Sequence, residues 1–307
     1  MSTAQASIST ASSKARADVY VAPKKGPNWK AYGRHLFLII MCLWVLLPLL
    51  WVVLLSFKTL QDGSQRYIWP QNGFIDPILT NYEFVLTKPR VVGPVWVNFK
   101  NSVLVTTLTV VAATVTSVLA GYALVHLKTP GARIITALLV ASMFFPTQVT
   151  AIIGIFNIQK RLGLINETWS LMLPYTALSV AISIFIMRGV FQTVPKDLTD
   201  SAKIDGANSI RTLFGIVFPL VKNGVVVVII VNFVAAWGEY LLALTLMNDA
   251  SRRTLPVFLG SASAGVGGLL WPRMAALYIL AILPALITFA IAQRWYMKGL
   301  QEGALKT

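Results

Sequence analysis

The sequence has few charged residues for its length. Charged side chains make up 12% of the 307 residues, whereas a soluble globular protein carries roughly a quarter. Hydrophobic residues reach 56%, and the mean hydropathy is +0.70. Such a chain cannot cover itself with a surface compatible with water. The composition therefore predicts an integral membrane protein and excludes a disordered chain or a coiled coil.

Residues that build covalent or metal frameworks are also scarce. Cys42 is the only cysteine, and His35 and His126 are the only histidines. One thiol forms no intramolecular disulfide, and two distant histidines without a cysteine cluster give no metal site. A membrane enzyme would need a nucleophile with its base, or clustered ligands, at a membrane face. The sequence therefore argues against an enzyme.

The sequence contains long runs of uncharged, mostly apolar residues. A bilayer core of ~30 Å needs about 20 helical residues, and continuously apolar runs lack the in–out alternation of barrel strands. We therefore expect an all-α membrane protein with six transmembrane helices. The runs cover residues 35–57, 101–127, 134–159, 168–187, 223–248 (broken once, by Glu239) and 274–293.

The basic residues indicate how these spans are oriented. Lys and Arg number 16 in the tails and loops on the side of the N-terminus and 10 on the other side, and such a bias marks the cytoplasmic side. We expect both termini in the cytoplasm, a tail over residues 1–35, one six-span domain over residues 36–307, and external loops at 58–100 and 247–273. The net charge of +15 then reflects topology and contact with membrane lipid. We expect no nucleic-acid partner.

The cytoplasmic loop at 193–220 has the pattern of two short helices joined by a sharp turn. Pro195 suits the first position of a helix. Gly206 stands where a helix would end in a left-handed residue. Ser209 is then expected to cap a second helix, which Pro219 would end.

The first of these helices has an unusual surface. Leu198, Ser201 and Ala202 fall at i, i+3 and i+4 and would give one small, mildly apolar face. Such a face next to a glycine turn suits insertion into a cleft of another protein. Two interpretations stay open from the residues alone, namely a docking element between subunits and an ordinary amphipathic loop helix.

The same loop resembles the EAA loop of ABC-importer permeases. That pattern reads E-A-A-x-x-D-G-A, then a Phe seven residues on, then L-P. The matching residues are Asp200-Ser201-Ala202-Lys203-Ile204-Asp205-Gly206-Ala207, then Phe214 and Pro219-Leu220. The chain departs from the pattern at Asp200 and Ser201, where charge sign and size are preserved.

Smaller motifs resemble the carbohydrate-uptake branch of these permeases, which is of the maltose-transporter type. Among them are Gly121-Tyr122-Ala123 and a tail that runs Gly299-Leu300-Gln301-Glu302-Gly303-Ala304-Leu305-Lys306. The resemblance covers residues 36–307. It implies a type I importer permease in the inner membrane, which forms half of a translocation pore for a sugar or oligosaccharide.

The resemblance also implies partners. These are two cytoplasmic ATP-binding subunits, an extracellular solute-binding protein, and a second permease, either a homologue that makes a heterodimer or another copy of this chain. The sequence contains no G-x-x-x-x-G-K-[ST] phosphate loop. We therefore expect no cofactor in this chain and no enzyme activity of its own, with ATP and Mg²⁺ bound by the partner subunits.

Residue roles follow from the resemblance by position. The loop residues expected to couple the permease to the ATPase are Asp200, Ser201, Ala202, Asp205, Gly206, Ala207 and Phe214. The external loop is placed to reach the binding protein through its glycines, which are Gly260, Gly265, Gly267 and Gly268.

Glu239 is the one acid well inside a run, and charge there is costly. Either it borders the translocation path or a partner permease, together with Trp237 and Gln148, or it meets water near the external end of its helix. An ion-gradient-driven secondary transporter remains the alternative function. It would predict internal repeats and several buried acids, whereas the sequence has one such acid and no clear repeat.

Overall fold

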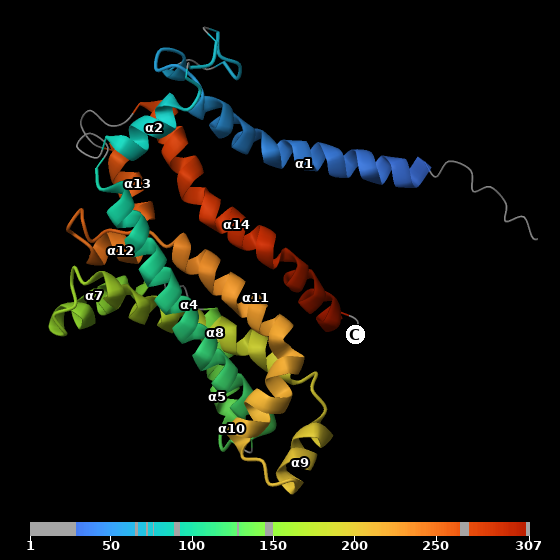
Figure 1. Cartoon of the computed structure of the whole chain (residues 1–307). Coiled ribbons are helices and arrows are strands. Elements are labelled where there is room, and N and C mark those ends of the chain that lie inside the picture. The colour runs from blue at the N-terminus through green and yellow to red at the C-terminus, as the bar shows by residue number, and fades with distance from the viewer. Residues whose placement is uncertain are drawn as a thin grey trace, which may run out of the picture. The chain divides into compact units, whose positions relative to one another are not determined.

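A computed structural model of the chain describes residues 29–64, 67–71, 73–75, 77–88, 93–127, 129–144, 150–264 and 270–304. The regular structure of these residues is helical, apart from one isolated antiparallel bridge between Lys58 and Phe74 (Figure 1). The expected all-α fold is confirmed.

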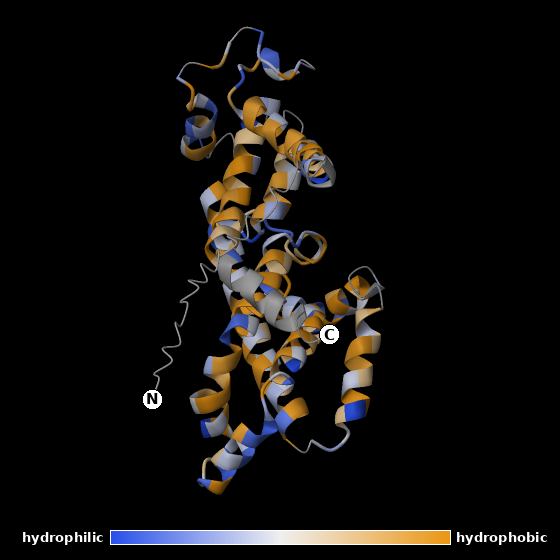
Figure 2. Cartoon of the chain, turned by 90° about the vertical axis from the view of Figure 1, so that its right-hand side faces the viewer, coloured by the Kyte–Doolittle hydropathy of each residue, from blue (hydrophilic) through white to orange (hydrophobic). Residues whose placement is uncertain are grey.

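Five helical segments of the described chain are long and apolar enough to cross a bilayer. Figure 2 shows hydrophobic residues dominating these long helices. They are α1 (Trp29–Ser56), α4 (Val95–His126), η2 with α8 (Thr168–Leu171 and Met172–Phe191), α10 to α11 (from Ser209 to Trp237) and α14 (Trp271–Ala304).

In the third predicted run, the described residues form two shorter helices. They are α5 (Ala132–Met143) and α7 (Ile152–Arg161). Pro146 lies between them, in a stretch outside the described residues. A proline inside a helix removes one backbone hydrogen bond and clashes with the preceding turn. The six apolar runs thus exist, but the third is not a single continuous helix, and the fifth is interrupted after Trp237, before α12 (Leu241–Leu246).

The chain divides into two compact units, residues 1–49 and 50–307. The first contains most of α1, whose sequence is apolar on all sides and includes Pro48. A helix of that kind is typical of a membrane environment. Most of the predicted N-terminal tail lies outside the described residues.

In the second unit, α4, α8 and α11 pack side by side. Their shared core includes Tyr122 from α4, Phe191 from α8 and Val221 from α11. Two glycines allow this close approach. A Cβ atom on Gly121 would lie 2.9 Å from the Met187 Cβ, and one on Gly224 would lie 2.6 Å from a Val190 methyl group. These three helices therefore behave as one packed body.

The loops predicted to be external are ordered over much of their length. The first carries η1 (Asp62–Ser64) and α2 (Thr80–Thr87), and the last carries α13 (Leu255–Ala264), which follows α12 (Leu241–Leu246). Asparagine side chains fasten both loops. The Asn81 amide donates to Ser56 O at 2.8 Å and Lys58 O at 3.0 Å, and the Asn98 amide donates to Ala250 O and Arg253 O, each at 2.9 Å.

Candidate functional site

The loop at 193–220 begins with a short helix and a glycine turn, as the sequence predicts. Helix α9 spans Lys196–Ile204, and Pro195 is its N-cap residue, one position before the first helical position predicted for it. Gly206 follows the helix with φ of 79°. The N–H groups of Gly206 and Ala207 donate to Lys203 O at 3.0 Å and Ala202 O at 2.9 Å. This is the paired bonding of a Schellman motif, so the predicted left-handed glycine is confirmed.

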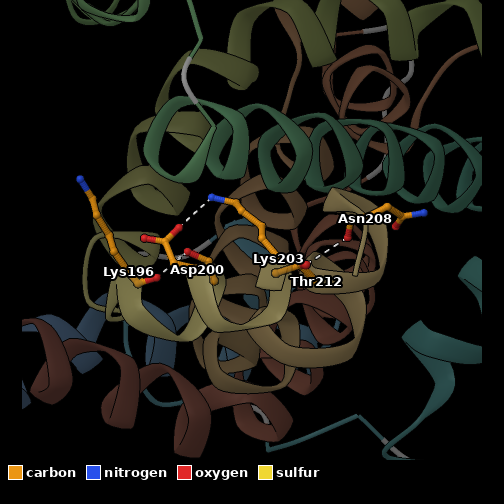
Figure 3. Close-up of polar contacts among 6 residues, drawn as sticks. Lys196, Asp200, Lys203, Asn208 and Thr212 are labelled. Carbon is orange, nitrogen blue, oxygen red and sulfur yellow. Dashed lines mark hydrogen bonds and ion pairs between the residues drawn. The ribbon is translucent and has the colours of Figure 1, made fainter. Parts of the chain in front are cut away.

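The second helix differs from the prediction at its start. Asn208, not Ser209, is the cap, because its side-chain oxygen accepts a hydrogen bond from Arg211 N at 2.8 Å. Figure 3 shows Asn208 beside Thr212, whose hydroxyl donates to Asn208 O at 3.0 Å. Asparagine is at least as good a cap as serine, and the sequence interpretation passed over it.

The second helix also differs at its end, since Pro219 does not terminate it. Helix α10 (Ser209–Thr212) leads into a π-helical turn, η3 (Leu213–Val217), and then directly into α11 (Phe218–Trp237). The N–H of Phe218 bonds back to Leu213 O. A π-turn admits one extra residue into a helix, and Pro219, the second residue of α11, follows that turn directly. The loop and the span are one continuous helix.

The inner face of the loop is anchored in the helix core. Thr199 and Ala202 of α9 are buried, and so are Leu213 and Val217 of the π-turn. The latter two belong to the same core as Tyr122. The face predicted for α9 is therefore divided, because Ala202 points inward while Leu198 and Ser201 are exposed.

The outer face of the loop carries apolar side chains that are largely exposed in the described chain. Ile204 is 87% exposed, Ile210 68%, Phe214 53% and Leu198 42%. Charged groups accompany them, including the ion pair of Lys203 Nζ with Asp200 Oδ1 at 2.8 Å (Figure 3). Exposed apolar side chains beside charged groups are a feature of surfaces that a partner covers. We call these four residues the outer apolar face.

The predicted coupling residues all lie on α9, the glycine turn or the π-turn. Ala202 is buried, Ala207 is half-buried, and the remaining residues of the set are exposed, namely Asp200, Ser201, Asp205, Gly206 and Phe214. The sequence interpretation missed Ile204 and Ile210. Their signal was available, since an isoleucine stands on each side of a polar turn in a loop outside the membrane.

The other predicted contact residues lie far from this loop in sequence. Gly260 belongs to α13 and packs closely against Tyr240, the N-cap residue of α12. A Cβ atom on Gly260 would lie 2.9 Å from the Tyr240 ring. Trp237 is buried, and its indole N–H donates to Ala281 O at 3.1 Å. Gln148 and the glycines at 265, 267 and 268 fall outside the described residues.

Glu239 lies in the break between α11 and α12, and its carboxylate stabilises this junction through hydrogen bonds. Its Oε1 accepts a hydrogen bond from Leu242 N at 2.8 Å, and its Oε2 accepts from Ala243 N at 3.1 Å and from the Tyr175 hydroxyl at 2.5 Å. The carboxylate thus caps α12 and ties it to α8. Sequence reasoning did not identify Tyr175, because no local pattern connects it to Glu239.

Loss of the Glu239 carboxylate is expected to loosen this junction. Glu239→Ala removes a helix cap, which costs about 0.5–2 kcal/mol, and leaves the buried Tyr175 hydroxyl unpartnered, which costs about 1–3 kcal/mol. We expect the free energy of unfolding in detergent to fall by about 2–4 kcal/mol, and Tyr175→Phe to cost about 1 kcal/mol. A Glu239→Ala protein as stable as the wild type would contradict the capping role.

Known proteins resemble this chain over most of its length. Residues 112–301 match the family described as binding-protein-dependent transport system inner membrane component. The sulfoquinovosyl glycerol transport system permease protein SmoH of Agrobacterium fabrum is 34% identical, over 85% of this chain and 89% of its own. The trehalose/maltose transport system permease protein MalG of Thermococcus litoralis is 29% identical, over 87% and 94%.

A solved structure shares the fold. A chain from the crystal structure of a bacterial ABC transporter involved in the import of the acidic polysaccharide alginate superposes with a TM-score of 0.75. It is 21% identical, and the match covers 87% of this chain and 96% of that one.

Proposed function

The chain belongs to the family of binding-protein-dependent transport system inner membrane components, and from this premise we propose that it imports a sugar or oligosaccharide in an ATP-driven complex. The chain is the permease subunit, an integral membrane protein. The names of its relatives support the cargo, since they include permeases for sulfoquinovosyl glycerol and for trehalose and maltose. The family favours this function over the ion-gradient-driven transporter that the sequence left open.

The outer apolar face is the observation that carries the energy-coupling part of the proposal. Two cytoplasmic ATP-binding subunits, which hold ATP and Mg²⁺, would each bind one permease at this face. Ile204, at 87% exposure, is the natural anchor, because apolar side chains that fill a partner's pocket dominate binding energy. The cytoplasmic position of this loop fits the bias of basic residues, with both termini on the same side.

The continuous helix from α10 to α11 supports a mechanical link. A displacement of the loop is passed to the span without an intervening flexible joint, because the backbone stays helical from Ser209 to Trp237. The buried Thr199 and Ala202 fix α9 to the same body. The spans would then move as rigid elements against a second permease and open the path alternately to each side.

The remaining contacts follow from the same function. We propose that an extracellular solute-binding protein docks at the loop of residues 247–273, including Gly260, Gly265, Gly267 and Gly268. Trp237, Glu239 and Gln148 are the proposed contacts to the path or to the partner permease. The described part of the 247–273 loop is held firmly by Asn98, as a docking surface requires.

Co-purification tests the proposal directly. We expect an affinity-tagged chain, expressed with its genomic neighbours, to retain an ATP-hydrolysing subunit in detergent. Ile204→Glu places a charge in the apolar contact, and loss of such an anchor weakens binding by about 2 kcal/mol or more, so the ATPase subunit should be lost on washing. Ile204→Val is the matched control and should retain it. A complex that survives Ile204→Glu would contradict the docking role.

A further inference from the structure

A groove with two arginines on its wall lies among α4, α5 and α8. Its volume is about 600 Å³. The arginines are Arg133 of α5 and Arg188 of α8, and no aspartate or glutamate is among the residues that line the groove. Helix α5 packs against α8, and Figure 1 shows α5 toward the same end of the bundle as α9 and α10. The groove is thus a positively charged site next to the cytoplasmic ends of the spans.

The two arginines lie on the same side of the membrane. Arg133 is the second residue of α5, and Arg188 lies one turn before the end of α8. The segment before α5 and the loop after α8 are both cytoplasmic in the orientation proposed above, which follows the bias of basic residues. The charged end of the groove therefore lies at the level of the lipid head groups of the inner leaflet.

The positive charge of this site is not compensated by the described protein. Neither arginine forms an ion pair within the described part of the chain. Arg133 also stands in the first turn of α5, where the helix dipole favours an anion and disfavours a cation. Gly131, the N-cap residue, provides no side chain to cap the N–H groups there. A bound anion would compensate both arginines and the dipole, and arginine matches the oxygens of a phosphate group well.

The rest of the groove is an apolar stripe that leads away from the arginines. Helix α5 lines it at positions i+3, i+4, i+7 and i+8 from Arg133, namely with Thr136, Ala137, Val140 and Ala141. These residues cover about 12 Å along the helix axis. The Thr136 hydroxyl already donates within its own helix, at 2.8 Å. A free phosphate ion would use only the charged end, whereas an acyl chain would fill the stripe as well.

The surface of α5 beside the groove is also apolar. Ile134 is 67% exposed and Leu138 is 65% exposed. In a membrane, such a surface contacts lipid tails or another span. A span of a partner subunit seldom brings a carboxylate into the apolar region, whereas an anionic phospholipid carries its phosphate and its acyl chain together. The cytoplasmic leaflet is rich in anionic lipids, and basic pockets between spans on that side bind their head groups.

We propose that this groove binds one anionic phospholipid of the cytoplasmic leaflet. The phosphate lies between Arg133 and Arg188, and one acyl chain follows the stripe from Ala137 to Ala141. The site is separate from the outer apolar face of the coupling loop. The inference rests on the membrane orientation proposed above and does not depend on the cargo.

Photolabelling of the complete complex tests the site. The complex, in phosphatidylcholine nanodiscs, receives a phosphatidylglycerol with a diazirine in its acyl chain, and the labelled peptides are mapped by mass spectrometry. We expect labelling of α5 over residues 136–141. A phosphatidylcholine analogue with the same acyl diazirine should label these residues at least about fivefold less. Arg133→Gln and Arg188→Gln should each lower phosphatidylglycerol labelling by about fivefold, since each removes one basic contact.

Two further variants separate the site from general charge effects and from misfolding. Arg161→Gln is the matched control, because Arg161 is an exposed arginine at the end of α7 and does not line the groove. It should leave the labelling of α5 unchanged. Ala137→Trp fills the stripe at an exposed position and keeps both arginines, and it should abolish the labelling even if an arginine variant fails to fold.

The outcomes distinguish the possible occupants. Equal labelling by the two lipids, or labelling that neither arginine variant lowers, would overturn the proposal. Displacement of the lipid by millimolar inorganic phosphate would show a site for a free anion and would overturn it too. If α5 is not labelled in the complex, a partner subunit covers the groove and the lipid site is wrong. Sugar uptake is measured separately, so the import function stands or fails independently of these results.

Discussion

Gly206→Leu is expected to reduce transport, and ATP hydrolysis stimulated by the binding protein, by at least about tenfold while the chain still inserts and folds. Gly206 has φ of 79°, and a Cβ there would meet nothing within 4 Å. The fold therefore bears only the backbone cost of a left-handed residue, about 1–2 kcal/mol. The new side chain would project from the turn beside Ile204, where the ATPase subunit is proposed to bind. The effect should thus appear in coupling and not in stability.

Gly163→Leu is a closely matched control. Gly163 has φ of 70°, is equally unobstructed, and ends α7 with the same pair of backbone hydrogen bonds, from Gly163 N to Lys160 O and from Leu164 N to Gln159 O. It bears the same backbone strain away from the coupling loop. The measurements are uptake and ATPase rate in proteoliposomes and unfolding in detergent. Normal transport by the Gly206→Leu protein would contradict the coupling role of the turn. An equal loss of transport in the Gly163→Leu protein would contradict it too.

Gly121→Leu is expected to prevent normal folding. A Cβ at this position would lie 2.9 Å from Met187 Cβ, 3.2 Å from a Phe191 ring carbon and 3.3 Å from the backbone nitrogen of Arg188. The backbone of α8 cannot move aside as a flexible side chain would. Overpacking a core costs about 1–3 kcal/mol and sometimes more, and leucine adds three further carbons to this contact. We expect loss of at least about 3 kcal/mol and little monodisperse protein.

Gly189→Leu serves as the control for this change. Gly189 lies on α8 next to Arg188 but is exposed, and nothing stands within 4 Å of its Cβ position. The same substitution there replaces a poor helix former by a good one and should leave folding intact. Yield after size-exclusion chromatography and the thermal midpoint measure both variants. A Gly121→Leu protein as stable as Gly189→Leu would show that α4 and α8 are not packed this closely.

Much of the coupling loop could be predicted because its signals are local. A helix after Pro195 and a left-handed Gly206 follow from the backbone preferences of proline and glycine, which act within one turn. The N-cap and the C-terminal end of the second helix were less predictable. Asn208 and Ser209 are both good caps, and only the direction of the backbone selects between them. Pro219 normally ends a helix, but the π-turn at Leu213–Val217 removes the conflict.

The site around Glu239 could not be predicted in the same way. The sequence identified Glu239 as an acid in an apolar run, but its contact with Tyr175 joins residues 64 positions apart. The hydrogen bond from Asn232 of α11 to Ser183 of α8 likewise joins residues that are 49 positions apart. No local preference encodes such proximity, because it depends on how three helices cross.

The sequence by itself determined the membrane environment, the apolar runs, the family and the glycine turn, because composition, run length and backbone preference are properties of neighbouring residues. Only the tertiary structure decided that the coupling loop and the fifth apolar run as far as Trp237 form one helix, that Ile204 and Ile210 are left exposed in the described chain, and that Glu239 caps α12. Those outcomes depend on which side chains meet across the packed helices, and packing joins residues that are distant along the chain.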